Sequence, residues 1–284
     1  MNKFNLSRNA AAFITGAAGG IGSAVAVELA KRGCHLALID KDEPGLKAVG
    51  ERLKIFKVRA SLHHVDVTDI PAMENLVSQV EREHGGIHLL INCAGVSLFG
   101  SVRQLSLEEF RWLLDNNVWG TIATTKLVLP VLEKQPSAHI VNLSSVYGLA
   151  APAGRAPYAT SKFAVRGFTE SLRHELESSR ISVGVIMPGG TMTQIAMRAR
   201  VAKAVNPDVA LKAKQAQTAL YKMSPEFVAN EIVNSIEERK GRVVIGPDAN
   251  KLDVLSRLFP SSYWNFIRKK LAAAINTGDN NASP

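Results

Sequence analysis

The sequence predicts a single α/β domain in which a doubly wound parallel sheet carries helices on both faces. Short apolar segments alternate with longer amphipathic ones along most of the chain. The short segments, such as Leu89-Leu90-Ile91, are apolar at nearly every position, which is typical of strands that are covered on both sides. A chain of 284 residues is long enough to bury a sizeable core in one such domain.

Seven strands are expected from the short apolar runs, near residues 10–15, 34–40, 60–66, 87–92, 138–144, 181–187 and 242–245. Helical periodicity separates them, near residues 20–32, 42–53, 70–84, 107–134, 157–179 and 225–239. We therefore assign residues 1–246 to the domain and residues 247–284 to a C-terminal extension.

The composition is that of a globular protein, with 46% hydrophobic and 21% charged residues. No run of about 18 uncharged apolar residues is present, so we expect no membrane-spanning helix. Residues 1–12 contain no long apolar stretch, so we expect no signal peptide. The two cysteines, Cys34 and Cys93, fall in or beside expected strands, which favours buried free thiols and a cytoplasmic location.

The net charge of +9 raises the question of a nucleic-acid partner. We find no nucleic-acid-binding motif, and acidic residues are spread through every expected helix, so we do not expect such a partner. No Cys/His set has the spacing of metal ligands, and we interpret His63-His64 as a surface pair.

A glycine-rich segment, residues 15–22, follows the first expected strand and reads TGAAGGIG. Val25 and Leu29 then follow at helical spacing. In such a strand–turn–helix unit the glycines let the backbone approach a pyrophosphate, and the helix N-terminus offers free N–H groups. The spacing is G-x-x-x-G-x-G, which differs from the commoner G-x-G-x-x-G but still predicts dinucleotide binding.

An acidic residue, Asp40, ends the second expected strand. A carboxylate at this position can accept hydrogen bonds from the adenosine ribose and repels a 2′-phosphate, so it favours NAD. Because Lys41 is adjacent and a cation there tolerates a phosphate, NADP remains the alternative.

Tyr158 and Lys162 are four residues apart in an expected helix, and they therefore share one face. An ammonium beside a phenol favours the phenolate and lowers its pKa from about 10 towards neutrality. This spacing is common on solvated helices, and it gains meaning only beside the dinucleotide turn. Together the two patterns predict proton transfer coupled to hydride transfer.

The motifs and their order resemble the short-chain dehydrogenase/reductase family, from about Asn9 to Val244. The resemblance implies a Rossmann fold, with Cys93 standing where the family usually has a second Asn. It also implies a cofactor site made of Gly16, Gly20, Ile21, Gly22, Asp40, Asp66, Val67, Asn92, Ala94, Gly95, Tyr158, Lys162, Pro188, Gly189, Thr191 and Thr193.

The same resemblance implies four catalytic residues. Tyr158 is expected to be the general acid/base, and Lys162 to lower its pKa and bind the nicotinamide ribose. Ser145 is expected to hold the substrate oxygen, and Asn117 to keep a water that links Lys162 to solvent. The cofactor carries the hydride, while the protein supplies position and electrostatics.

Two regions bear on the substrate. Residues 194–223, which we call the lid segment, hold six basic residues against one acid, Asp208. These basic residues could attract an acidic or CoA-like substrate, or an anionic membrane surface. We favour the alternative that they form the solvated face of a helix. The extension mixes aromatic and basic residues near 263–271, as an interfacial helix does, but we favour a helix packed on its own body or on another subunit. Residues 276–284 are expected to be disordered.

The function expected is oxidation or reduction of a lipophilic secondary alcohol or ketone, since the extension resembles those of family members acting on such molecules. A 3-oxoacyl thioester reductase and a non-catalytic dinucleotide-binding scaffold are the alternatives. In the family the long helices, here near 107–134 and 157–179, pair between subunits, so the resemblance implies a homodimer or homotetramer. Peripheral membrane contact through the extension is a further alternative.

Overall fold

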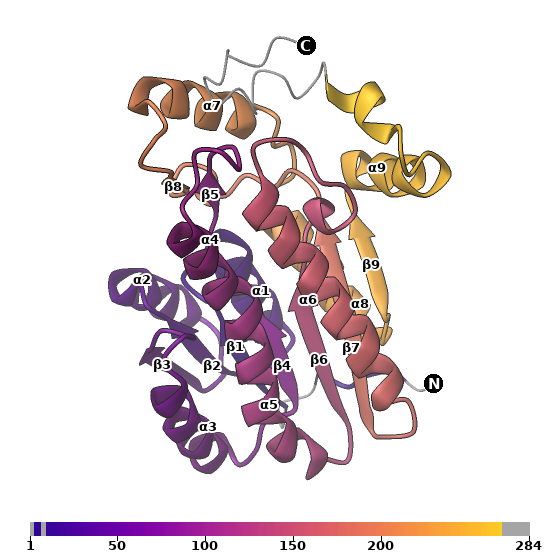
Figure 1. The fold of residues 1–284 in the computed structure, drawn as a ribbon. Coiled ribbons are helices and arrows are strands. Elements are labelled where there is room, and N and C mark those ends of the chain that lie inside the picture. The colour runs from indigo at the N-terminus through magenta and orange to yellow at the C-terminus, as the bar shows by residue number, and fades with distance from the viewer. Residues whose placement is uncertain (1–2, 7–9, 269–284) are drawn as a thin grey trace.

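The computed structural model of the chain describes residues 3–6 and 10–268 (Figure 1). Its centre is a seven-stranded parallel sheet with the strand order β3-β2-β1-β4-β6-β7-β9. All seven expected strands are confirmed at nearly the expected bounds: β1 (Ala11–Thr15), β2 (His35–Asp40), β3 (Ala60–His64), β4 (Leu89–Asn92), β6 (Ala138–Leu143), β7 (Ile181–Pro188) and β9 (Arg242–Ile245). The order reverses beside β1, which has β2 on one side and β4 on the other.

Helices cover both faces of the sheet, and each face has its own core. Phe13 and Ile14 are neighbours on β1, and their side chains enter different clusters, as alternation along a strand requires. The cluster around Ile14 includes α1 (Gly20–Lys31), α2 (Glu43–Leu53) and α8 (Pro225–Glu237). The cluster around Phe13 includes α3 (Ile70–His84), α5 (Gly120–Glu133) and α6 (Ala156–Glu175). The doubly wound architecture is thereby confirmed.

The helix expected near 107–134 is one continuous element with a π-helical turn inside it. It consists of α4 (Leu107–Leu114), the turn Asp115–Trp119 and α5. Ser106 and Glu109 begin α4 with a reciprocal capping box. Gly120 follows the turn and packs closely against Val67. A Cβ on Gly120 would lie 2.7 Å from Cγ2 of Val67, so only glycine fits there without displacing that side chain. Such π-helical turns are frequent at functional sites, and this one carries Asn117.

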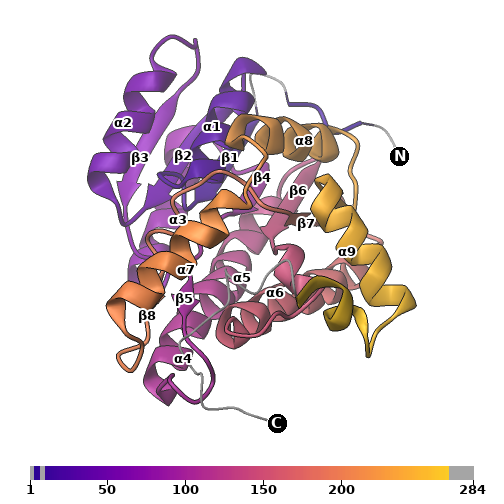
Figure 2. The same ribbon diagram turned by 90° about the horizontal axis from the view of Figure 1, so that it is seen from above.

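The lid segment contains structure that the sequence analysis did not predict. Two short strands, β5 (Leu98–Phe99) and β8 (Arg200–Val201), pair in parallel outside the main sheet. They precede α7 (Pro207–Ala219), which lies over the carboxyl end of the main sheet, with α9 (Pro247–Leu258) on the other side of that end (Figure 1 and Figure 2). A small apolar cluster holds the lid together, made of Phe99, Ala202, Val205, Ala210 and Ala213.

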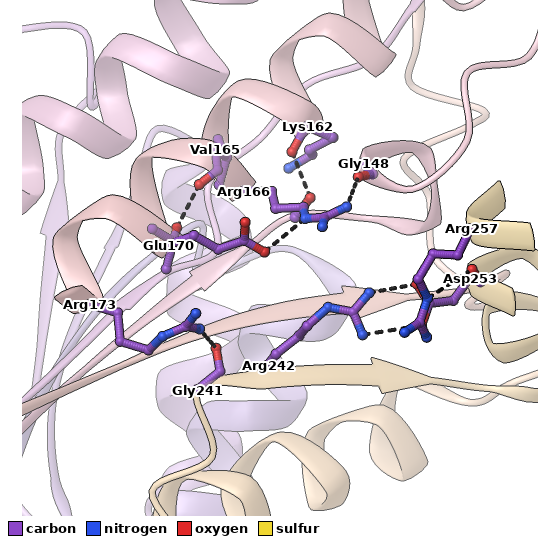
Figure 3. A network of polar contacts seen from close by, with 12 residues as sticks. Gly148, Lys162, Val165, Arg166, Glu170, Arg173, Gly241, Arg242, Asp253 and Arg257 are labelled. Carbon is purple, nitrogen blue, oxygen red and sulfur yellow. Dashed lines mark hydrogen bonds and ion pairs between the residues drawn. The ribbon is translucent and has the colours of Figure 1, made fainter. Parts of the chain in front are cut away.

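The first part of the C-terminal extension, which contains α9, packs on the body of the protein, whereas the aromatic and basic stretch near 263–271 lies partly outside the described residues. Asp253 of α9 accepts hydrogen bonds from Arg242 of β9 at 3.1 and 2.5 Å and also pairs with Arg257 (Figure 3). Further along, the Tyr263 hydroxyl accepts a 2.9 Å hydrogen bond from the Ala151 amide. The expected disordered tail, residues 276–284, lies outside the described residues.

The interpretation of His63-His64 as a surface pair is wrong for His63. Its side chain is buried, and Nε2 lies 2.7 Å from the Ser61 hydroxyl. Ser61 and His63 are two residues apart on β3 and therefore face the same side of the sheet, whereas His64 is exposed. In the part of the chain that the structure describes, no helix is long and apolar enough to cross a membrane.

Candidate active site

The expected site residues gather at the carboxyl ends of the parallel strands. Thr15 ends β1, Asp40 ends β2, Asn92 ends β4 and Pro188 ends β7. Parallel strands bring these ends to one edge of the sheet, where open α/β folds bind their ligands. Tyr158 and Lys162 lie in the first turns of α6, which follows β6.

The glycine-rich turn is closely packed and leaves no room for a side chain at Gly16 or Gly22. Gly16 has a φ of +67°, and a Cβ there would lie 2.6 Å from the Ala94 backbone. A Cβ at Gly22 would lie 2.2 Å from the Gly16 carbonyl oxygen. Helix α1 begins after Gly19 without a side-chain cap, so its first N–H groups stay available to an anion, and Ile21 packs against the core from the first turn.

The carboxylate of Asp40 closes this turn. One oxygen accepts a 2.9 Å hydrogen bond from the Ala18 amide, and the other accepts a 3.0 Å bond from the Asp42 amide. The neighbouring Lys41 points to Asp66, with its Nζ 3.2 Å from that carboxylate and 3.3 Å from the Asn116 amide oxygen. Burial opposes the ionisation of Asp66, yet hydrogen bonds from Thr68 and Lys41 hold its pKa below the ordinary value.

Asn92 and Ala94 shape the segment after β4. The Asn92 amide is buried and donates to Thr125 at 2.9 Å and to Asn142 at 2.8 Å, so its side chain joins β4 to its neighbours. The Asn92 Oδ1 is buried and has no hydrogen-bond partner among the described residues. The Ala94 amide donates to the Thr15 hydroxyl at 3.3 Å. Burial raises the pKa of the Cys93 thiol to about 12, which agrees with a structural thiol.

The loop after β7 is tied to the start of α9, a connection that the sequence analysis missed. Asp248 accepts a 2.8 Å hydrogen bond from the Gly190 amide, and a Cβ at Gly189 would lie 2.2 Å from its carboxylate. Thr191 is buried and donates to the Gly189 carbonyl at 3.1 Å. Thr193 lies against Gly20, which joins this loop to the glycine-rich turn.

The four expected catalytic residues converge on one space. The Lys162 Nζ lies 5.6 Å from the centre of the Tyr158 ring and donates a 2.9 Å hydrogen bond to the Leu143 carbonyl. A Cβ added to Gly95 would lie 3.5 Å from both the Lys162 Nζ and the Asn117 amide oxygen. Ser145 lies close enough to Tyr158 to lower the pKa of its hydroxyl, against the larger effect of burial.

The Asn117 side chain is fixed in place. Its oxygen accepts a 2.8 Å hydrogen bond from the Val96 amide, and its nitrogen donates to the Val96 carbonyl and to Ser161, both at 3.0 Å. Its own carbonyl accepts a 2.9 Å bond from the Thr121 hydroxyl. The π-helical turn therefore holds Asn117 at the edge of the site.

The expectation that Lys162 lowers the pKa of Tyr158 towards neutrality is wrong for this structure. Burial raises the Tyr158 pKa to about 12, although the nearby Ser145 side chain opposes that rise. Burial also lowers the Lys162 pKa to about 8. The physical reason is that both groups are desolvated and the ammonium is directed at Leu143, so burial outweighs their attraction.

A second tyrosine belongs to the same site and was not predicted. The Tyr147 ring meets the Tyr158 ring edge to face, with 6.0 Å between their centres. Tyr147 lies in a short 3₁₀ turn after β6, and its backbone amide donates to Ser145 at 3.2 Å. Arg166 of α6 fixes the end of this turn by donating to the Gly148 carbonyl at 3.3 Å (Figure 3).

Residues 10–204 match the family model described as short chain dehydrogenase. The chain belongs to the short-chain dehydrogenase/reductase family. A Mycobacterium tuberculosis protein, SadH, an oxidoreductase by its name, is 35% identical over 263 residues, which is 92% of this chain and 95% of SadH. Dehydrogenase/reductase SDR family member 7B of Xenopus tropicalis is 28% identical over 92% of this chain and 85% of its own. This short-chain dehydrogenase/reductase is thus an oxidoreductase with a Rossmann fold.

Solved structures of the family have the same architecture. A short-chain dehydrogenase/reductase from Burkholderia phymatum in complex with NAD has a TM-score of 0.81 and 26% identity, covering 99% of both chains. A short-chain dehydrogenase from Burkholderia cenocepacia in complex with NADP has a TM-score of 0.73 and 27% identity, covering 87% of this chain and 100% of its own. Relatives of this fold therefore hold either dinucleotide.

Proposed function

We propose that this protein interconverts a lipophilic secondary alcohol and the corresponding ketone with a bound nicotinamide dinucleotide, preferentially NAD. The observation that carries the proposal is the convergence of Tyr158, Lys162 and Asn117 beside Gly95, with Ser145 close enough to Tyr158 to lower its pKa. This set combines a proton donor, a cation and a hydroxyl at the strand ends where the fold binds ligands.

The residues present fit a dinucleotide. Gly16 and Gly22 pack so closely against neighbouring backbone that neither has room for a Cβ, which keeps the turn tight, and α1 begins beside it with uncapped N–H groups. Asp40 lies on the same turn as an acceptor for the ribose hydroxyls, and Asp66 with Val67 follows β3 beside it. When bound, the nicotinamide supplies or accepts the hydride.

The proton is handled by the protein. Ser145 holds the substrate oxygen, and Tyr158 donates a proton to that oxygen in reduction or takes it in oxidation. Lys162, with a pKa of about 8, is able to exchange a proton near neutral pH and so to reload Tyr158. Asn117 positions the solvent-facing end of this relay, because its side chain lies against the same space as Lys162.

Apolar groups at the mouth of the site support a lipophilic substrate. Met192 and Met197 of the segment after β7 are 51% and 36% exposed, which is unusual for such side chains in a globular protein. The partly exposed Tyr147 ring adds apolar surface beside Tyr158. A substrate with an apolar body would cover these groups.

Replacement of Tyr158 tests the chemistry. Tyr158→Phe keeps the ring and removes the hydroxyl, so turnover should fall by at least about a hundredfold while NADH binding persists. Tyr147→Phe is the matched control, because its hydroxyl has no role in the proposed proton transfer. A screen of secondary alcohols with NAD supplies the substrate for the assay. Unchanged turnover in Tyr158→Phe would refute the mechanism, and absence of any turnover would favour the scaffold alternative.

The cofactor preference is tested by fluorescence titration with NADH and NADPH. NADH should bind more tightly, and Asp40→Asn should reduce that preference by about tenfold, because it removes the charge that repels a 2′-phosphate. Lys41→Gln is the control and should change the preference little, since Lys41 is already paired with Asp66. Tighter binding of NADPH by the unmodified protein would instead favour ketone or 3-oxoacyl thioester reduction.

A second copy of the chain is proposed as a partner. Leu107 is 88% exposed and Trp119 is 60% exposed, and they line one apolar surface with Phe110 and Leu114 on and beside α4. Burial of this surface in a dimer or tetramer would remove it from water. Light scattering should give a dimer or larger, and Trp119→Glu should dissociate it. A monomer at micromolar concentration would contradict the proposal.

The extension leaves peripheral membrane contact as an alternative use of α9. Leu258 at the end of α9 and Phe266 in the residues that follow it are exposed, with Arg257 and Arg268 close to them in sequence. Co-sedimentation with vesicles containing phosphatidylserine would support this alternative, and its absence would leave a cytoplasmic oxidoreductase that acts on dispersed substrate.

A further inference from the structure

Arg155 is a buried cation without a counter-ion in the described part of the chain. It lies just before α6, three residues ahead of Tyr158, and only 1% of its surface is exposed. Its guanidinium lies over the Phe99 ring, 4.8 Å from the ring centre, and its Nη2 donates to the Gln217 side chain of α7. Its Nε and Nη1 are buried and have no hydrogen-bond partner among the described residues.

This arrangement is unfavourable unless something binds there. Nε and Nη1 carry more than half of the N–H donors of a guanidinium, and buried donors without partners lose free energy. Within residues 3–6 and 10–268 no carboxylate lies within 4.0 Å of Arg155, so its charge is not neutralised by an ion pair. A desolvated arginine stays charged, because its ordinary pKa is far above neutrality.

A second cation, Lys214 of α7, approaches the same place. Burial lowers the pKa of Lys214, and the charge of Arg155 lowers it further, so the two groups repel each other. The Lys214 Nζ donates to the Met197 carbonyl at 3.1 Å, and no ion pair to it is present in the described residues. Two cations that lack an acidic partner create a positive potential at this point of the lid.

The Arg155 charge lies near three tyrosines, of which Tyr158 and Tyr147 belong to the candidate active site. The Arg155 charge interacts with Tyr147, Tyr158 and Tyr221, and it lowers the pKa of each of them against the larger effect of burial. Phe99 of β5 and Gln217 of α7 close the site from the lid. Arg155 therefore stands between the catalytic residues and the lid.

We infer that Arg155 binds a carboxylate group of the substrate, so that the lipophilic alcohol or ketone is also an acid. This inference rests on the proposed function and deepens it. Gln217 positions the guanidinium, and Lys214 brings a second positive charge from the lid.

The test uses octanoate and octanamide, which differ in charge and share the apolar chain. Each is titrated into the full-length protein saturated with NADH, and the change in nicotinamide fluorescence gives its Kd. Octanoate should bind at least about tenfold more tightly than octanamide, because a hydrogen-bonded ion pair in a buried site is worth that much. Acetate should bind weakly, because it lacks the chain.

Variants identify the residue responsible. Arg155→Met should abolish the preference for octanoate and leave octanamide binding nearly unchanged, whereas Arg155→Lys should retain part of the preference. Lys212→Met, which removes an exposed cation from the same helix as Gln217, is the matched control and should retain all of it. A second variant, Gln217→Glu, is available if Arg155→Met does not fold. Its carboxylate would neutralise Arg155 internally, so this variant should be more stable and should also lose the preference for octanoate.

The outcomes separate this inference from the proposed function. Equal binding of octanoate and octanamide, with NADH bound and turnover intact, would overturn the role of Arg155 alone. Binding of acetate as tight as that of octanoate would also overturn it, because the site would then hold a free small anion. Failure to bind NADH would refute the proposed function instead.

Discussion

Gly20, at the start of α1, lies directly against the side chain of Thr193 in the loop after β7, so that a Cβ on Gly20 would lie 2.6 Å from the Thr193 Cγ2. Both residues belong to the proposed dinucleotide site, Gly20 through the glycine-rich turn and Thr193 through the loop after β7. The glycine-rich turn and the loop after β7 therefore set each other's position. A change in one should be felt as a change in cofactor affinity.

Gly20→Ala should weaken NADH binding by about tenfold or more, because overpacking of this kind typically shifts neighbouring groups at a cost of 1–3 kcal/mol. Thr193→Ser removes the Cγ2 atom and should restore most of the affinity in the double variant. Gly167→Ala is the control, since a Cβ at Gly167 meets nothing within 4 Å, and it should leave NADH binding unchanged. Additive effects of the two substitutions on the Kd would contradict direct contact.

The pKa of Tyr158 predicts the pH dependence of each direction. Oxidation needs the phenolate, and with a pKa of about 12 its fraction rises about tenfold per pH unit through the working range. We therefore expect kcat/KM for alcohol oxidation to rise continuously from pH 6 to pH 10, with a bend near the Lys162 pKa of about 8. Ketone reduction needs the protonated phenol, so kcat/KM for reduction should not decrease as the pH is lowered from 8.

The measurement is kcat/KM in both directions across that range, in the unmodified protein and in Tyr147→Phe. The profile of Tyr147→Phe should be the same, because that hydroxyl takes no part in the proton transfer. An oxidation profile that levels off near pH 7 would mean that Tyr158 has a depressed pKa in the working enzyme, as the family resemblance first led us to expect.

The main sheet could be predicted from the sequence because its strands are buried on both faces. A run such as Leu89-Leu90-Ile91 is apolar at every position, as a strand in the middle of a doubly covered sheet is. Asp40 and Asn92 end such runs, which places both at the carboxyl edge of the sheet. The two-residue strands β5 and β8 could not be predicted, because each forms only where the other meets it. The π-helical turn at Asn117 could not be predicted for the same reason, because its conformation depends on the surrounding structure and not on its local sequence.

The chemistry of the site was predictable in its residue types and not in its electrostatics. The spacing of Tyr158 and Lys162 correctly places both on one face of a helix. Their pKa values depend on burial, which the sequence does not reveal, and burial reverses the expected shift of Tyr158. Arg155 lies in a stretch of Ala, Gly and Pro, residues 150–157, that resembles a surface loop, yet the fold leaves only 1% of the Arg155 surface exposed. Sequence periodicity gives no signal for such a residue.

The contact between Asp253 and Arg242 should anchor the C-terminal extension. Burial opposes ionisation of Asp253, but hydrogen bonds from Arg242 and Arg257 hold its pKa below the ordinary value (Figure 3). Asp253→Asn should lower the free energy of unfolding by about 2 kcal/mol, less than for a fully buried pair because both arginines reach solvent. The backbone amides of α9 should also exchange hydrogen faster in Asp253→Asn than in the unmodified protein. Arg257→Gln, on the more exposed partner, should cost less than about 1 kcal/mol, and equal effects of the two would contradict this assignment.

Stability at acidic pH should depend on His139 of β6. Its side chain is 1% exposed, its Nδ1 lies 2.8 Å from the Ser182 hydroxyl, and burial, helped by the charge of Arg239, lowers its pKa to about 3. The unfolded chain takes up this proton near pH 6.5 and the folded chain does not, so stability is full above 6.5 and is lost as the pH falls towards 3, by about 1.4 kcal/mol per unit. His139→Asn keeps a partner for Ser182 and cannot be protonated, so between pH 7 and pH 5 it should lose about 2 kcal/mol less than the unmodified protein in urea unfolding.

The exposed His64→Asn is the control and should follow the unmodified protein. Parallel pH curves for His139→Asn and the unmodified protein would show that acid acts elsewhere, first of all at the buried His63 and His84, whose pKa values burial also lowers.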